Sequence, residues 1–389
     1  MKPIYLDNNA TTQVDPLVKA AMDPFFKELY GNPSSLHQFG TVLLPHMKKA
    51  FDSIYNIIDA PDEDDVIITS CGTESYNTVV KGIYFHEILG KSQNHIITSN
   101  VEHPAGINSL KFLESLGASV TYLPVNKMGS VSAGQVEEAI TDKTVLISIM
   151  WANNETGSLF PIHDIGEIAK KRGVLFHTDA VQAIGKVPVS VIKNHVDYLS
   201  FSGHKFHAPK GIGGLYIKKG NKIPPLFHGG EQMASLRGGT HNVPGIIGMG
   251  VAADLAARNL TAEDTTVRAM RDDLENYILN NIPDTFLNGA KDDRTPNTTN
   301  ISFLGIEGEA ILWDLNQNGI AASTGSACAS ESLEPSHVLR ALNIDPNLSH
   351  TAIRFSLSRF NSREEIERVK EIMVKIVKRL RSISMSYKG

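Results

Sequence analysis

Short apolar runs alternate with helix-like stretches between about residues 65 and 216, and this alternation restricts the folds that the chain can adopt. The runs are nearly continuous in Val, Ile and Leu, which is typical of strands buried on both faces of a sheet. They are DDVIITS, NHIITS, ASVTYLP, TVLISIMWA, VLFHTDAV, VDYLSFS and GGLYIKK. Regular strand–helix alternation indicates βαβ units. We therefore predict an α/β fold built on a mostly parallel sheet.

The pattern changes after about residue 260. There, TAEDTTVRAMRDDLENYILNN predicts a long amphipathic helix, and SREEIERVKEIMVKIVKRLRSIS predicts another at the end of the chain. Between them, TTNISFL, IAASTGSAC and HTAIRFSLSRF indicate short strands. This order predicts a smaller α+β unit after the large one.

Charge and cysteine content restrict the functions that the chain can have. The net charge is −5 over 389 residues, so nucleic-acid binding is not expected as the main role. No apolar run approaches the roughly 20 residues of a membrane span. The opening MKPIYLDNNATT lacks a secretory pattern, so we expect a cytoplasmic protein without membrane contact. The two cysteines, Cys71 and Cys328, are poor evidence for a disulfide and too few for a metal site of their own.

Polar segments follow five of the predicted strands. These segments are CGTES, NVEHPA, NNETG, DAVQ and SGHK. Ligands of open α/β sheets bind beyond the carboxyl ends of the strands. We therefore expect the five segments to contribute to one site.

Lys205 and Asp179 are the two charged residues of most interest at these strand ends. A lysine in a water-poor pocket has a lowered amine pKa and can form a Schiff base with an aldehyde, whereas a surface lysine is solvated and inert. Gly203, within SGHK, allows close approach of the backbone. Asp179 is either a helix cap or the partner of a protonated heterocyclic nitrogen. On its own, Asp179 is better explained as a cap.

The CGTES segment opens a helix and could hold an anion. Gly72 allows a tight turn, Thr73 offers a hydroxyl, and the first N–H groups of a helix favour phosphate. Ser202 and His204 could add donors. An ordinary capped helix start is the alternative.

Taken together, these residues indicate pyridoxal phosphate as the cofactor. Lys205 would hold the aldehyde, Asp179 would pair with the pyridine nitrogen, and the CGTES turn would bind the phosphate. His103 could stack on the ring, or it could be a capping or core histidine. Asn154 and Gln182 could hydrogen-bond the ring hydroxyl.

Two residues near the end of the chain complete the candidate site. Cys328 lies among small and polar residues in STGSACASES, so a reactive thiol is a better interpretation than a packed one. Arg354 lies within a strand-like run and would bind a carboxylate, unless an internal salt bridge occupies it. RGGT, which ends at Thr240, could reach a phosphate.

The motifs YLDNNATT, TDAVQAIGK, SGHKFHAPKGIGG, RGGT, STGSACAS and IRFSLSRF resemble those of cysteine desulfurases of the NifS/IscS type, in the same order and nearly end to end. The NifS-like bacterial branch is the most similar. The resemblance implies a class-V aminotransferase of pyridoxal-phosphate fold type I that works as a homodimer. It implies a large domain at residues 15–258 and a small domain formed by residues 1–14 plus 259–389. The small domain would carry a mobile loop at about residues 323–335.

The resemblance also implies the role of each site residue. Lys205 and Cys328 would be catalytic with His103, and Arg354 with Asn154 would bind the substrate. The implied cofactor-binding set is Gly72, Thr73, His103, Asn154, Asp179, Gln182, Ser202, Gly203, His204, Lys205 and, from the other subunit, Thr240.

The implied reaction converts L-cysteine to L-alanine and leaves the sulfur on Cys328 as a persulfide. The resemblance associates the long polar segment after Cys328 with transfer to an iron–sulfur scaffold of the NifU/IscU type, with Cys328 at most a transient cluster ligand. Thiolated tRNA and other cofactors stay open as final destinations of the sulfur. A selenocysteine lyase, a pyridoxal-phosphate aminotransferase and a non-catalytic sulfur carrier remain as alternatives.

Overall fold

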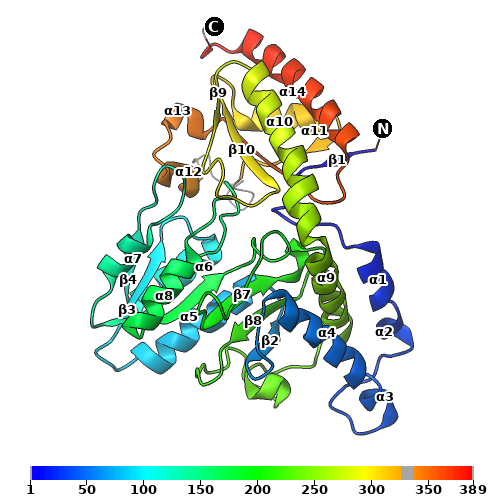
Figure 1. The fold of residues 1–389 in the computed structure, drawn as a ribbon, viewed down its shortest axis with the longest axis vertical. Coiled ribbons are helices and arrows are strands. Elements are labelled where there is room, and N and C mark those ends of the chain that lie inside the picture. The colour runs from blue at the N-terminus through cyan, green and yellow to red at the C-terminus, as the bar shows by residue number, and fades with distance from the viewer. Residues whose placement is uncertain (1, 326–335, 388–389) are drawn as a thin grey trace.

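The computed structural model describes residues 2–325 and 336–387. Its central feature is a seven-stranded sheet in the order β2-β8-β7-β6-β5-β3-β4 (Figure 1). Strand β8 runs opposite to the other strands of this sheet, and it lies between β7 and β2. The predicted mostly parallel sheet is confirmed. The strands are β2 (Asp65–Thr69), β3 (His95–Ser99), β4 (Ser119–Leu123), β5 (Thr144–Ser148), β6 (Leu175–Asp179), β7 (Tyr198–Ser202) and β8 (Gly213–Ile217).

Helices cover both faces of this sheet. Those on one face are α5 (Gly72–Ile83) and α6 (Pro104–Ser115), and those on the other are α4 (Leu44–Ile57), α7 (Ala133–Ala139), α8 (Ile162–Arg172) and α9 (Val243–Ala262). Consecutive strand residues point to opposite faces, so Ile96 of β3 packs on the first side and Ile97 on the second. Because both faces are buried, the strands need no polar alternation.

The longest helical stretch joins the two parts of the chain. Helix α9 continues through a π-helical turn at Glu263–Val267 into α10 (Arg268–Asn281). The helix predicted from residue 261 therefore begins much earlier, at Val243. At Gly250 an added Cβ would lie 2.4 Å from the Cα of Ala50 in α4, so the two helices approach closely. The proposed domain boundary at residue 258 falls inside this helix and stays a prediction.

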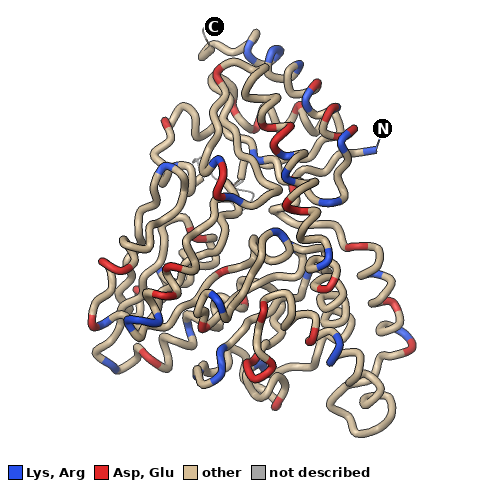
Figure 2. Tube along the Cα trace, in the orientation of Figure 1, with Lys and Arg blue, Asp and Glu red and all other residues tan. Residues whose placement is uncertain are grey.

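The C-terminal part is built on a three-stranded antiparallel sheet in the order β12-β10-β9. Its elements are β9 (Thr285–Leu287), β10 (Thr298–Phe303), α11 (Gly308–Gln317), β12 (Ala352–Ser356) and α14 (Arg363–Ile383). Helix α14 begins with a capping box between Ser362 and Glu365. Figure 2 shows basic residues along its C-terminal half, where they complement the helix dipole.

The N-terminus returns to this second part of the molecule. Strand β1 (Ile4–Tyr5) pairs in parallel with β11 (Ile320–Ala321), and Asp7 forms a bridge with Ser356. The remaining helices are α1 (Pro16–Met22), α2 (Pro24–Lys27), α3 (Gln38–Thr41), α12 (His337–Ala341) and α13 (Pro346–Ser349). In the described residues, no helix has both the length and the apolar character needed to cross a membrane.

Candidate active site

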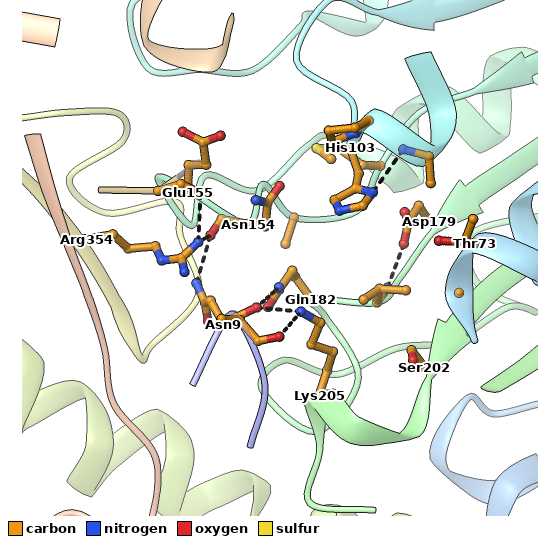
Figure 3. Close-up of a pocket in the computed structure, with 18 of the residues that line it drawn as sticks. Asn9, Thr73, His103, Asn154, Glu155, Asp179, Gln182, Ser202, Lys205 and Arg354 are labelled. Atoms are coloured by element: carbon orange, nitrogen blue, oxygen red, sulfur yellow. Dashed lines mark hydrogen bonds between the residues drawn. The ribbon is translucent and has the colours of Figure 1, made fainter. Parts of the chain in front are cut away.

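The carboxyl ends of β2, β3, β5, β6 and β7 meet at one cavity of about 470 Å³ (Figure 3). The structure brings together there most of the residues singled out from the sequence. Those that line the cavity are Gly72, Thr73, His103, Asn154, Asp179, Gln182, Ser202, His204, Lys205 and Arg354. The topology explains this, because parallel strands place their carboxyl ends at the same edge of a sheet.

Lys205 is the last residue of the 3₁₀ turn Gly203–Lys205, which directly follows β7. Its Nζ donates hydrogen bonds to the backbone oxygens of Asn9, at 2.6 Å, and Ala10, at 2.8 Å. The side chain is partly buried and points into the cavity, toward Asn9 and Gln182 (Figure 3). The amine is therefore held inside the site and does not extend into bulk solvent.

Asp179 is the last residue of β6 and reaches the cavity with part of its surface. Its Oδ1 accepts a hydrogen bond from the backbone N–H of Val181 at 2.9 Å. Burial raises the pKa of the Asp179 carboxyl to about 6, although the Val181 N–H and the Lys205 charge act in the opposite direction. The carboxylate thus caps the following turn and also faces the cavity, where a cation would stabilise its charge.

The start of α5 lies at the cavity. Cys71 precedes the helix without capping it through its side chain, and the first N–H groups of a helix have no partner within the helix, which favours an anion at such a position. Ser202 Oγ is buried and has no hydrogen-bond partner among the described residues. At Gly72 an added Cβ would lie 2.8 Å from Cγ2 of Val181, so glycine keeps this part of the cavity open.

His103 and His204 line the cavity as neutral rings. Burial, followed by the charge of Lys205, lowers the pKa of each to about 4. His103 is also the N-cap of α6, because its Nδ1 accepts the N–H of Ala105 at 3.1 Å. The capping role left open by the sequence is thus real, and it fixes the proton of the neutral ring on Nε2.

Arg354, on β12, is 2% exposed and already has an acidic partner. Its Nη2 donates to Oδ1 of Asp7 at 2.6 Å, and its Nη1 donates to the backbone oxygen of Asn154 at 2.9 Å. Its Nε has no partner in the described part of the chain. The internal salt bridge considered from the sequence is therefore present, and the residue still lines the cavity.

Two of the predicted residues do not line this cavity, and a third lies outside the described residues. Gly203 is buried beside it, where an added Cβ would lie 3.0 Å from the Cβ of Ala208, so it contributes close packing. Thr240 lies in a separate cavity of about 70 Å³. Cys328 lies outside the described residues, and the residues that flank residues 326–335, Gly325 and Ser336, both line the main cavity.

The sequence interpretation missed several residues of the site. The Asn9 backbone oxygen accepts hydrogen bonds from both Lys205 and Gln182. At the level of sequence, the YLDNNATT motif that contains Asn9 indicates only the resemblance to the family. Glu155 is buried, burial raises its pKa, and its Oε2 accepts a hydrogen bond from Ser336 at 2.6 Å. The acidic residue in NNETG was the available signal.

The aminotransferase class-V family model matches residues 4–369 of this chain. A cysteine desulfurase from a Nostoc species is 48% identical over 384 residues, which span 99% of this chain and 95% of that protein. The chain belongs to the cysteine desulfurases of the class-V aminotransferase family. Cysteine desulfurase NifS of Azotobacter vinelandii is 47% identical over 389 residues, spanning 100% of this chain and 96% of that protein. The solved structure of a NifS-like protein is 38% identical with a TM-score of 0.90, covering 97% of this desulfurase and 100% of that chain.

This desulfurase depends on pyridoxal phosphate and has the corresponding type I fold. The donor set fits the cofactor, because the buried Ser202 hydroxyl lacks a partner among the described residues and the Gly72 turn leaves room beside it. The Asp179 carboxylate suits a protonated ring nitrogen. Among residues 2–325 and 336–387, no cluster of three or more His, Cys, Asp or Glu side chains could hold a metal ion.

Proposed function

We propose that this desulfurase converts L-cysteine to L-alanine, leaves the sulfur on Cys328 as a persulfide, and delivers it to an iron–sulfur scaffold protein of the NifU or IscU type. The observation that carries the proposal is the Lys205 amine, held by two backbone oxygens in one cavity with Asp179 and Arg354. The reaction balances: cysteine and the Cys328 thiol give alanine and the Cys328 persulfide. An S–S bond forms while the substrate C–S bond breaks, and the carbon takes that electron pair and a proton.

Each described residue has a task in this reaction. Lys205 would hold the cofactor aldehyde and then take the α-proton of the substrate. Asp179 would keep a proton on the ring nitrogen, while Asn154 and Gln182 would hydrogen-bond the ring hydroxyl oxygen. Bound there, pyridoxal phosphate supplies the electron sink that weakens the bonds at the substrate α-carbon. Thr73, Ser202, His204 and the N-terminus of α5 would bind its phosphate.

His103 would lie against the cofactor ring in its neutral form. Because its pKa is about 4 and its Nδ1 accepts the Ala105 N–H, the ring presents an N–H at Nε2 near pH 7. This favours a stacking and donor role for His103 over the role of a base toward Cys328.

The test compares the two cysteines. The Cys328→Ser enzyme should keep the visible absorbance of the bound cofactor but form no protein-bound sulfur from L-cysteine, while alanine falls to background. Cys71→Ser removes the other thiol, which lines the same cavity, and should still form both protein-bound sulfur and alanine. Normal persulfide formation by Cys328→Ser would reject the nucleophile assignment. Added scaffold protein should then take up the sulfur from the wild-type enzyme.

We also propose that the enzyme is a homodimer that works in the cytoplasm, where thiols stay reduced. Several large apolar side chains between α1 and α3 are exposed, and they are Leu17, Phe26, Tyr30, Leu36 and Phe39; the ring centroids of Tyr30 and Phe39 lie 5.8 Å apart. Exposed apolar side chains in one segment favour an interface with a second copy, and Thr240 would reach the cofactor phosphate of that copy. Light scattering should give twice the chain mass, and Leu36→Glu combined with Phe39→Glu should give the monomer. A monomeric wild type would reject the proposal.

A further inference from the structure

A second buried lysine is connected to the active-site lysine through hydrogen bonds. Lys186 is 6% exposed, and its Nζ donates to Oε1 of Gln182 at 2.5 Å. Nε2 of Gln182 donates to the backbone oxygen of Asn9 at 2.9 Å. That same oxygen accepts the hydrogen bond from Lys205. Lys186, Gln182, Asn9 and Lys205 therefore form one continuous chain.

This chain determines which way the Gln182 amide faces. The Lys186 amine donates in this contact, and in its charged form it has no lone pair with which to accept, so its partner is the amide oxygen. A backbone carbonyl can only accept, so its partner must be the amide nitrogen. Oε1 is thus turned toward Lys186, and Nε2 faces the Asn9 side of the cavity. Asn9 takes one N–H of Nε2, and the other is left for a group in the cavity that Gln182 lines.

The position of Lys186 is otherwise unfavourable for a cation. Burial is the main cause that lowers the pKa of its amine to about 7; the charges of Lys205 and Arg354 act in the same direction and Glu263 in the opposite one. A buried charge destabilises the fold unless it is well paired, and an apolar side chain of similar volume would not carry this penalty. The hydrogen bond to Gln182 is therefore the feature that accounts for a lysine at this position.

The backbone places the side chains of Gln182 and Lys186 next to each other. Lys186 comes four residues after Gln182 in a helix-like turn, in which the N–H of Lys186 bonds to the backbone oxygen of Ala183. Between them, Gly185 has a φ of 75°, in the region that favours glycine. An added Cβ there would lie 3.1 Å from the Cβ atoms of both Ala256 and Phe206, so the turn is tightly packed.

We propose that Lys186 is a positioning residue that fixes the Gln182 amide with its N–H side toward the ring hydroxyl oxygen of the cofactor. The inference rests on the assignment of Gln182 to that oxygen in the proposed function. Without the amine, the Asn9 oxygen alone restrains the amide, so the N–H that faces the ring oxygen is less firmly fixed.

The experiment measures cofactor binding and its spectrum as well as turnover. Cofactor-free Lys186→Met and Gln182→Leu proteins are titrated with pyridoxal phosphate, and the pH midpoint of the visible band is recorded for each. Both variants should bind the cofactor about tenfold more weakly, the expected cost of one hydrogen bond to a charged group. Both midpoints should shift in the same direction. Lys186→Arg, which keeps a donor, should restore part of the loss, and the exposed Lys193→Met is the matched control.

The double variant Lys186→Met/Gln182→Leu distinguishes this inference from the proposed function. If Lys186 acts through Gln182, the double variant binds the cofactor no more weakly than Gln182→Leu alone. Additive losses overturn the inference while leaving the Gln182 assignment intact. An unchanged spectrum in Gln182→Leu overturns the inference together with that assignment. Lys186→Gln, uncharged but still a donor, replaces the methionine variant in the same comparison if that variant does not fold.

Discussion

Nη2 of Arg354 donates a hydrogen bond to Oδ1 of Asp7 at 2.6 Å. Strand β12, which carries this candidate substrate anchor, is therefore bonded to the N-terminal segment. The same segment supplies the Asn9 oxygen that receives the Lys205 amine. Nε of Arg354 has no partner among the described residues. A buried guanidinium with an open donor on a cavity is suited to a ligand carboxylate.

Replacing Arg354 by lysine should raise the KM for L-cysteine at least about tenfold, with a smaller effect on kcat. A lysine has a single nitrogen and cannot hydrogen-bond to Asp7, the Asn154 oxygen and a substrate carboxylate in the geometry of a guanidinium. Steady-state kinetics measure the effect. Arg359→Lys, which replaces an arginine paired with Asp15 at 2.8 Å, is the control. An equal rise of KM in both variants would remove Arg354 from substrate binding.

Glu102 should make the stability of the cofactor-free enzyme depend on pH. It is 1% exposed, its Oε2 has no partner within the described chain, and burial raises its pKa to about 8. A raised folded-state pKa means that the stabilising contribution is complete below the unfolded value of about 4.5 and is lost as the pH rises through 8. Glu102→Gln keeps an oxygen for Ser99 and the Met150 N–H and cannot ionise.

The unfolding free energy of Glu102→Gln relative to wild type should therefore increase from pH 5.5 to pH 8.5, by about 3 kcal/mol. Urea unfolding at the two pH values measures this difference, in which most other titrating groups cancel. The exposed Glu138→Gln should show no such trend. A constant difference for Glu102→Gln would mean that the carboxyl is already ionised at pH 5.5.

Gly72→Ala should weaken pyridoxal phosphate binding by about tenfold or more. The new Cβ would lie 2.8 Å from Cγ2 of Val181, so the start of α5 or the Val181 turn must shift where the phosphate is expected. Titration of the cofactor-free protein measures the loss. In Gly134→Ala, in α7, the new Cβ would lie 3.9 Å from Oγ of Ser132, and cofactor binding should be unchanged. Unchanged affinity in Gly72→Ala would place the phosphate elsewhere.

The sheet could be predicted because buried strands such as β5 have a distinct apolar composition. Most of the site could be predicted because its polar side chains lie at or just after strand ends: Asp179 ends β6, and Lys205 lies in the turn that follows β7. Helix α9 was missed because its glycines and alanines are buried around much of the helix, so no amphipathic stripe marks it.

The contacts made by backbone atoms could not be predicted in the same way. Lys205 is held by the main-chain oxygens of Asn9 and Ala10, which any residue type would supply. Sequence spacing also did not reveal that Gln182 is shared between Asn9 and Lys186. Such contacts become visible only when distant segments are placed together.

The return of the N-terminus to the C-terminal part has a consequence for biosynthesis. Ile4 pairs with Ile320, and the Asn8 N–H bonds to the Ser356 oxygen. The segment that receives the Lys205 amine can therefore form these contacts only after residues near the end of the chain have been synthesised. A nascent chain on the ribosome therefore carries an incomplete cavity. Capture of the vitamin B6 cofactor should follow release of the finished polypeptide, and truncated products should stay colourless.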